Sequence, residues 1–218
     1  MFTGIVEEIG RVESVQQAGE SIVMQIAASK VVSDVHLGDS ISINGVCLTV
    51  TSFTDASFSV DIMPETFRAS SLRQLAPNSS VNLERAMSAK GRFGGHFVSG
   101  HVDGVGEITR VEQIDNAIYY DISIPRNLLI YFVEKGSVSV DGTSLTVFGI
   151  GEHSLTISLI PHTVEETVLG KKRVGDTVNI ECDMLGKYIM RYLEQRSGSK
   201  PEPTASLGSQ FFEDHGFK

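Results

Sequence analysis

The chain has 218 residues, 41% of them hydrophobic, which is enough for one or two domains with cores of their own. Its formal net charge of −9 at pH 7 argues against nucleic acid or an anionic membrane surface as a partner. No apolar run approaches the roughly 18 residues of a membrane helix, and we expect no signal peptide at the N-terminus.

Short segments rich in β-branched residues predict β structure in the first half of the chain. The expected strands cover residues 5–15, 22–27, 40–44, 47–53 and 58–62. Asn44-Gly45 predicts a hairpin turn between two of them, because both central positions of that turn favour φ > 0. A polar stretch after Pro64 could form one helical turn with proline at its first position.

The second half has the same pattern. A glycine-rich stretch, 91–106, leads into expected strands at 102–111, 118–124, 137–140, 144–148 and 155–159. Asp141-Gly142 again predicts a hairpin, and Pro161 a helical turn. Near the end, apolar residues at helical spacing between 185 and 193 predict an amphipathic helix. This helix could pack on the β structure (its own barrel) that precedes it, or join subunits. We expect the tail from Ser197 to be disordered.

The two halves are copies of each other. The run 41–50, which contains NGVCLTV, reappears at 138–147 with DGTSLTV, and the two glycines, Gly45 and Gly142, are 97 residues apart. A period of this size corresponds to a small domain rather than to a solenoid repeat. Frequent short strands and turns predict a small barrel or sandwich in each copy. Two similar domains indicate two similar pockets.

Most chemistry that depends on a cofactor lacks its motif here. There is no dinucleotide fingerprint and no Walker loop, and the six histidines show no metal-ligand spacing with cysteine or carboxylate. A serine-hydrolase elbow is missing as well. Cys47 aligns with Ser144 of the second copy, so a covalent cysteine nucleophile is not favoured. Cys47 and Cys182 stand far apart, which favours free thiols in a reducing compartment and predicts a cytoplasmic protein.

Small hydroxyl residues recur at matched positions, although each is more often structural than ligand-binding. These pairs are Thr3 and Ser99, Ser40 and Ser137, Thr49 and Thr146, and Thr66 and Thr163. Elsewhere the second copy gains polar groups. The changed pairs are Ile5 and His101, Gly38 and Lys135, Glu65 and His162, and Ala86 and Asp183. If both copies bind the same molecule, the two pockets treat it differently.

Several motifs in order resemble the riboflavin synthase family, from Met1 to about Arg196. They are the opening MFTGIVE, the NGVCLTV and DGTSLTV runs, MPET at 63–66, GGHFVSGHVDG at 94–104 and IPHT at 160–163. The resemblance implies an all-β fold of two tandem six-stranded Greek-key barrels related by internal duplication, plus a C-terminal α-helix. The implied parts are a first lumazine-binding barrel at 1–96, a second at 97–184, a trimerisation helix at 185–196 and a tail at 197–218.

The resemblance also implies the reaction. Two molecules of 6,7-dimethyl-8-ribityllumazine bind per active site, and a four-carbon unit passes from one to the other without a cofactor or metal. The site then lies between the first barrel of one chain and the second barrel of its neighbour, which implies a homotrimer and favours a subunit-joining role for the helix. Association with lumazine synthase is a further expectation, and neither nucleic acid nor a membrane is expected as a partner.

The same resemblance assigns site residues by matching position. In the first barrel they are Gly4, Ile5, Val6, Ser40, Cys47, Leu48, Thr49, Ile62, Met63 and Thr66. In the second they are Gly100, His101, Val102, Lys135, Ser144, Leu145, Thr146, Ile160, Pro161, His162 and Thr163, with Asp183 near the ribityl chain. For chemistry the candidates are Ser40, Cys47 and His101, with Phe2 shaping the site.

The roles of two candidates stay open between alternatives. His101 is either a proton shuttle near neutral pH or a hinge residue whose ring bonds to backbone. Cys47 would adjust the position of the ring or of a water rather than attack covalently. At the level of the whole chain, the alternative function is a non-catalytic lumazine- or flavin-binding antenna of the same fold. We favour the enzyme because both copies keep their LTV and Pro-x-Thr motifs.

Overall fold

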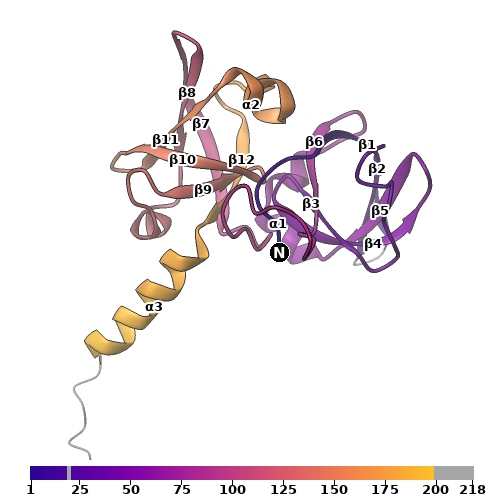
Figure 1. Cartoon of the computed structure of the whole chain (residues 1–218), viewed down its shortest axis with the longest axis horizontal. Helices are drawn as coiled ribbons and strands as arrows, with labels where there is room; N and C mark the ends of the chain where they lie inside the picture. Colours follow the sequence, from indigo (N-terminus) through magenta and orange to yellow (C-terminus); the bar gives the residue numbers. More distant parts are fainter. Residues whose placement is uncertain (19–20, 199–218) are drawn as a thin grey trace, which may run out of the picture. The chain divides into compact units, whose positions relative to one another are not determined.

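The computed structural model describes residues 1–18 and 21–198. The chain divides into two compact units, 1–184 and 185–218, and the first unit holds both barrels. In Figure 1 the first barrel runs from indigo to purple and the second from magenta to orange. The tail that we expected to be disordered lies, from residue 199 onward, outside the described residues.

The first barrel is a closed six-stranded antiparallel sheet in the order β1-β2-β5-β4-β3-β6. Its strands are β1 Glu8–Ala18, β2 Ser21–Ala27, β3 Ser40–Ile43, β4 Val46–Phe53, β5 Ser57–Ile62 and β6 Ser80–Arg85. Strands β3, β4 and β5 follow one another as hairpins, and β6 returns to lie beside β3, which is the Greek-key connection.

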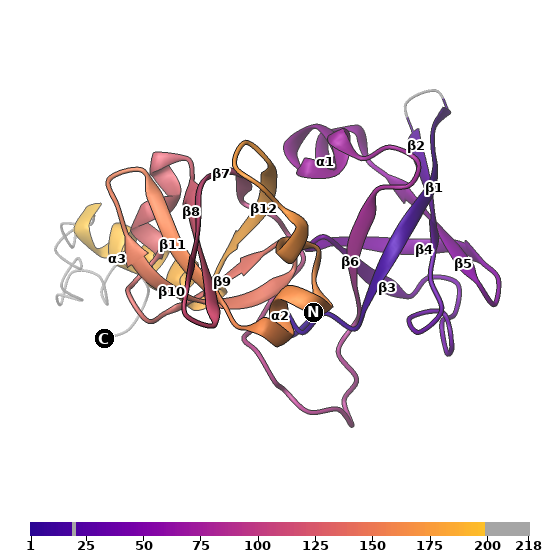
Figure 2. The same ribbon diagram turned by 90° about the horizontal axis from the view of Figure 1, so that it is seen from above.

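The second barrel repeats this connection strand for strand, in the closed order β7-β8-β11-β10-β9-β12 (Figure 2). Its strands are β7 Gly104–Ile114, β8 Ala117–Ser123, β9 Ser137–Val140, β10 Thr143–Ile150, β11 Ser154–Leu159 and β12 Thr177–Cys182. The fold expected from the family resemblance, two tandem barrels and a C-terminal helix, is therefore confirmed.

Two differences from the strands expected from residue patterns matter for the site. Strand β1 begins at Glu8 and β7 at Gly104, so residues 3–6 and 99–102 are free to leave their own barrels. Residue patterns alone also missed β6 and β12. Their alternation is interrupted because Asn82 and Glu84 in β6, like Asn179 and Glu181 in β12, are polar yet buried.

Helical structure is sparse. Each expected turn after a proline is present, as α1 Pro64–Ala69 and α2 Pro161–Glu166, with proline at the start. Three 3-10 helices accompany them, η1 Ser71–Gln74, η2 Arg126–Tyr131 and η3 Val168–Lys171. The amphipathic helix is α3, Met184–Gly198, and its apolar side chains Leu185, Tyr188, Ile189, Tyr192 and Leu193 are 48–71% exposed. Within the described part of the chain, no helix has both the length and the hydropathy to cross a membrane.

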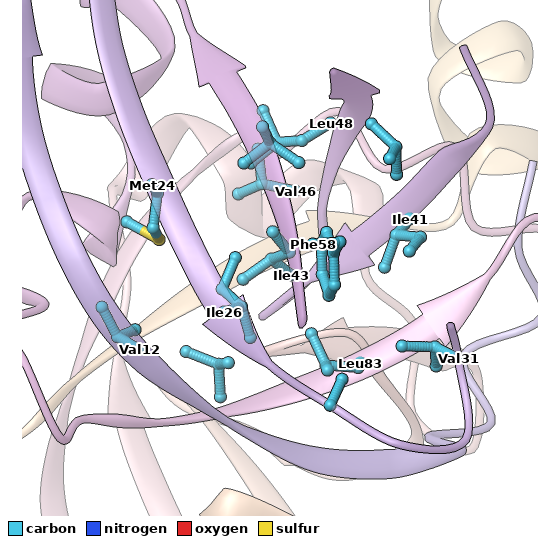
Figure 3. Packing of buried hydrophobic residues seen from close by; sticks show 14 of the residues in the cluster. Val12, Met24, Ile26, Val31, Ile41, Ile43, Val46, Leu48, Phe58 and Leu83 are labelled. Atoms are coloured by element: carbon cyan, nitrogen blue, oxygen red, sulfur yellow. The ribbon is translucent and has the colours of Figure 1, made fainter. Parts of the chain in front are cut away.

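Alternation along the strands fills each barrel. Met24 and Ile26 of β2 point inward with the residues of the neighbouring strands, as Figure 3 shows. On β4 the side chains of Val46, Leu48 and Val50 are buried, while Cys47 is only half-buried and Thr49 is exposed. Because successive side chains of a strand face opposite sides, Cys47 and Thr49 lie on the outer surface of the barrel. Any site built on them is therefore outside the barrel core.

The hairpin turns of the two copies meet back to back. A Cβ atom added to Gly45 would lie 2.8 Å from the backbone nitrogen of Gly142, and one added to Gly142 would lie 2.7 Å from that of Gly45. Both glycines also have positive φ, 83° and 78°. Only glycine satisfies both the turn and this close approach, so the NG and DG dipeptides predicted as hairpins also form the contact between barrels.

Buried asparagines extend this contact with matched hydrogen bonds. Nδ2 of Asn82 donates to the carbonyl oxygen of Asp141 at 2.8 Å, and Oδ1 of Asn82 accepts from the backbone N–H of Val168 at 2.8 Å. Asn179 makes the equivalent pair of bonds in the other direction, to Asn44 O at 2.8 Å and Ser71 N at 2.7 Å. These bonds satisfy buried backbone groups of the partner barrel, which makes the two barrels one unit.

One ion pair, between a buried carboxylate and a half-buried lysine, breaks the symmetry. Asp141, wholly buried, stands where the first copy has Asn44, and Lys172, whose Nζ is 3.4 Å from an Asp141 oxygen, stands where it has Leu75. Burial raises the pKa of Asp141, and the charge of Lys172 together with the Asn179 N–H opposes that shift only in part. Lys172 therefore offsets part of the free-energy cost of burying the Asp141 carboxylate.

We expect Lys172→Leu to lower the free energy of unfolding by about 3–5 kcal/mol at neutral pH, because it leaves a buried charge unpaired. A carboxyl whose folded pKa is raised costs stability as the pH rises from its unfolded value, about 3.9, to its folded one. The stability lost in Lys172→Leu should therefore become smaller as the pH falls toward about 4. Adding Asp141→Asn, which recreates the Asn44 and Leu75 pair of the first copy, should restore most of it. Urea unfolding at acidic and neutral pH measures both; an equal loss in the single and double variants contradicts this account.

Candidate functional site

A short segment of each copy binds to the barrel of the other copy. We call residues 3–6 and 99–102 the crossing segments. The backbone N–H of Ser144, on β10, donates to the carbonyl oxygen of Gly4 at 2.7 Å, and that of Cys47, on β4, donates to Gly100 at 2.9 Å. Val102 packs against the core cluster of the first barrel, not the second.

This corrects the expected grouping of the site. Sequence matching placed Gly4, Ile5 and Val6 in the first pocket and Gly100, His101 and Val102 in the second. The backbone hydrogen bonds instead tie Gly4 to the second barrel and Gly100 to the first, and His101 and Val102 line the cavity of the first barrel. The reason is geometric: each segment precedes the first strand of its own barrel and hydrogen-bonds to the backbone of a strand in the other. A repeat alignment matches the segments to each other and cannot reveal which barrel each contacts.

Close packing requires the two glycines at the crossings. Gly100 has φ +82°, and a Cβ there would lie 2.5 Å from Cβ of Cys47. Gly4 has φ +76°, and its Cβ would lie 2.6 Å from Cβ of Ser144. Distances below 3.0 Å do not occur for real Cβ contacts, so any side chain here would push the segment off its strand.

A cavity of about 300 Å³ lies on the outer face of the first barrel, beside the crossing segment. Its walls come from β4, from α1 and the residue after it, and from the segment itself. The lining residues are Val46, Cys47, Glu65, Thr66, Ala69, Ser70, Gly100, His101 and Val102. A volume of this order suits a small heterocyclic ligand. Of the candidates for chemistry, the structure brings Cys47 and His101 together in this cavity.

At the matching place on the second barrel, a histidine covers the serine. Nδ1 of His96 and Oγ of Ser144 are 2.7 Å apart and share a hydrogen bond. His96 is buried, and its other ring nitrogen, Nε2, has no hydrogen-bond partner among the described residues. Burial lowers the pKa of His96, and the charge of Asp183 opposes that shift only in part. This imidazole therefore favours the neutral form.

His96 has no counterpart in the first copy, so the two pockets differ more than the paired residues indicate. Sequence reasoning did not place it in the site; its only signal was its position in the glycine-rich stretch, five residues before His101. Glu84 and Glu181, which hold the crossing segments, were also missed, although the repeat aligns them. Within residues 1–18 and 21–198, no three histidine, cysteine or acidic side chains cluster to hold a metal ion.

Lys135 occupies a strained position. Its φ is +64°, and the matched residue in the first copy is a glycine, Gly38, at +91°. The backbone N–H of each donates to an equivalent carbonyl, that of Val147 at 2.8 Å and that of Val50 at 3.0 Å. Nζ of Lys135 lies 3.9 Å from the centroid of the Phe148 ring. A lysine kept where glycine would be unstrained indicates a role for its side chain.

The remaining candidates divide into a buried and an accessible group. Phe2 is wholly buried and pairs with Val98 through two backbone bonds, so it supports both segments from below. Leu48, Leu145 and Ile62 belong to the barrel cores. Ser40 lines a separate hollow of about 150 Å³ with Asp39 and Arg85 rather than the Cys47 cavity. The accessible candidates, exposed or half-buried, are Ile5, Val6, Thr49, Met63, Thr146, Ile160, Pro161, His162, Thr163 and Asp183.

Comparison with known proteins gives a consistent picture. The profile of the lumazine binding domain matches twice, at residues 3–86 and 99–183. Riboflavin synthase of Bacillus subtilis (strain 168) is 55% identical over 217 residues, and that of Actinobacillus pleuropneumoniae 49%, each covering 100% of both chains. Riboflavin synthase of Schizosaccharomyces pombe is 44% identical over 197 residues, covering 89% of this chain and 94% of that protein.

Solved structures give the same fold at lower identity. The crystal structure of LumP complexed with riboflavin has a TM-score of 0.77 at 23% sequence identity, covering 84% of this chain and 99% of that one. LumP complexed with 6,7-dimethyl-8-(1'-D-ribityl) lumazine has a TM-score of 0.75 at 22% identity, covering 83% and 98%. At this level of identity the likeness concerns the fold alone.

The crossing segments yield a testable difference between two glycines with positive φ. Gly100→Ala should lose about 3–5 kcal/mol of stability, from backbone strain and from the clash with Cys47. Gly38→Ala should lose only about 1–2 kcal/mol. Its φ of +91° gives backbone strain, but no atom lies within 4 Å of an added Cβ, so there is no clash. Urea unfolding of both variants measures the difference. Equal losses would mean that the crossing is not closely packed.

Proposed function

The chain belongs to the riboflavin synthase family, and from this premise we propose that it joins two molecules of 6,7-dimethyl-8-ribityllumazine. A four-carbon unit passes from one to the other, which gives riboflavin and 5-amino-6-ribitylamino-2,4(1H,3H)-pyrimidinedione. The observation that carries the proposal is the 55% identity with the Bacillus subtilis enzyme along the full length of both chains. The duplicated barrels support it, with a cavity beside Cys47 on the first and the matched residue, Ser144, hydrogen-bonded to His96 on the second.

We propose that the reaction is a transfer that needs no cofactor. The two products together contain all the atoms of the two substrate molecules, so no oxidant, reductant or water is consumed overall. What the protein must supply is orientation, since a bimolecular step between two held reactants can gain roughly 7–11 kcal/mol from proximity alone. It must also place donors where negative charge develops on the deprotonated ring system.

Within this proposal His101 exchanges the proton of the acidic 7-methyl group. It stands exposed at the wall of the first cavity, which Cys47 and Thr66 also line, and a positioned imidazole can accept and return a proton. Cys47 would set the position of the ring. On the second barrel, Ser144 with His96, 2.7 Å apart, offers polar groups to the other lumazine.

We further propose that three chains assemble, so that the first barrel of one faces the second barrel of its neighbour. The five apolar side chains of α3, 48–71% exposed, supply a surface for this assembly. Lumazine synthase is the proposed supplier and partner, because it makes the substrate. A cytoplasmic location forms part of the proposal, and the two free thiols suit a reducing compartment.

Incubation of the purified chain with the lumazine alone tests the function. We expect the absorbance of riboflavin to appear without any added cofactor, at one riboflavin per two lumazines consumed. A non-catalytic antenna protein would instead hold its ligand unchanged. Binding with no turnover after prolonged incubation would overturn the proposal.

The proposed assembly can be tested on α3. Ile189→Glu places a charge on the apolar face and should give single chains with turnover reduced at least about tenfold, because the two half-sites no longer meet. Arg191→Gln changes the charge by the same amount on the polar face and should leave mass and turnover as they are. Light scattering and riboflavin formation measure both. A fully active single chain would contradict the shared site.

A further inference from the structure

A buried carboxylate holds the crossing segment that carries His101. Glu181, on β12, is 2% exposed. One of its oxygens accepts hydrogen bonds from the backbone N–H of Ser99 at 2.6 Å and from the Ser99 hydroxyl at 2.7 Å; the other accepts from the N–H of Gly100 at 2.9 Å. Charge-assisted bonds of this kind to a buried backbone are strong and directional.

The opposite side of the segment is fixed by the first barrel. The carbonyl of Gly100 accepts from the Cys47 N–H at 2.9 Å, and Gly100 has no room for a Cβ. The next residue is His101, whose own N–H donates to the Ser99 hydroxyl at 3.2 Å. The backbone of His101 is therefore anchored through residues that Glu181 holds, while its side chain stands at the wall of the cavity.

We propose that Glu181 is a positioning residue, which sets the place of His101 in the first-barrel cavity through Ser99 and Gly100. The proposal rests on the function proposed above, because it concerns the alignment of that reaction's proton-transfer group. Glu181 belongs to the second barrel and acts on a pocket of the first. The β12 strand of one barrel thus controls the geometry of the other barrel's site.

The first copy contains the same hydrogen-bond network, but a different residue follows the held glycine. Glu84 accepts from the N–H and the hydroxyl of Thr3, both at 2.7 Å, and from the N–H of Gly4 at 3.0 Å. The N–H of Ile5 donates to the Thr3 hydroxyl at 3.3 Å. In the first copy the residue that follows the held glycine is Ile5 rather than a histidine. The chain thus shows that threonine can replace serine in this network.

That comparison supplies a matched set of variants. Ser99→Ala removes the hydroxyl that bonds both Glu181 and the N–H of His101, whereas Ser99→Thr keeps it. Glu181→Gln replaces one acceptor oxygen by a donor that faces another donor. Glu8→Gln is the control: Glu8 likewise receives the N–H and hydroxyl of Ser29, at 2.7 and 2.9 Å, but lies outside both pockets.

Two readouts separate positioning from general stability. The first is kcat and KM for riboflavin formation by the full chain. The second is the ring signal of His101 in histidine-labelled protein, assigned among the six histidines by its loss in His101→Gln. We expect Ser99→Ala and Glu181→Gln to lower kcat by about tenfold to a hundredfold with a smaller change in KM, and to shift the His101 signal. Ser99→Thr should stay within about twofold of wild type.

Several outcomes would overturn the proposal. These are wild-type kcat in both Ser99→Ala and Glu181→Gln, a fall in kcat with an unmoved His101 signal, and an equal fall in Glu8→Gln. If Glu181→Gln does not fold, the Ser99 pair decides alone, since loss in alanine and rescue in threonine is the required result. If the wild-type chain forms no riboflavin, the proposed function fails, and the His101 signal still tests whether Glu181 holds the segment.

Discussion

Two backbone hydrogen bonds organise this molecule, from Ser144 to the carbonyl of Gly4 and from Cys47 to that of Gly100. Each ties the start of one copy to a strand of the other copy's barrel, β10 or β4. They are possible only because both carbonyls belong to glycines in the left-handed region that pack directly on a strand. The cavity beside Cys47, the placement of His101 and the burial of Phe2 beneath the segments all follow from this exchange.

Duplication provides two equal frames, and substitutions at a few positions make them unequal. Where the first copy has Asn44, the second has Asp141 paired with the half-buried Lys172, and where the first has Gly38, the second has Lys135 at positive φ. His96, from the stretch that joins the copies, covers Ser144, whereas Cys47 faces an open cavity. The two barrels thus present unlike side chains, as the proposed reaction requires, because one of two identical molecules gives and the other receives.

Much of the fold was accessible from the sequence, because alternation on β4 determines that Val46 and Leu48 face the core and Cys47 faces outward. The repeat likewise predicted two like domains. The exchange of segments was not accessible, since a repeat alignment pairs Gly4 with Gly100 whichever barrel each one contacts. His96 was missed because it has no partner in the other copy. Strands β6 and β12 were not predicted because their buried asparagines and glutamates interrupt the alternation of polar and apolar residues.

The crossings also bear on ancestry. In a lone barrel of this kind, the backbone N–H on the fourth strand would lack the carbonyl that a crossing segment supplies. Two identical copies could each provide that segment to the other. Joining such a pair end to end replaces a concentration-dependent encounter with a tethered one. Gene fusion would then preserve such a dimer within a single polypeptide, in which each half can diverge while it stays attached to the other.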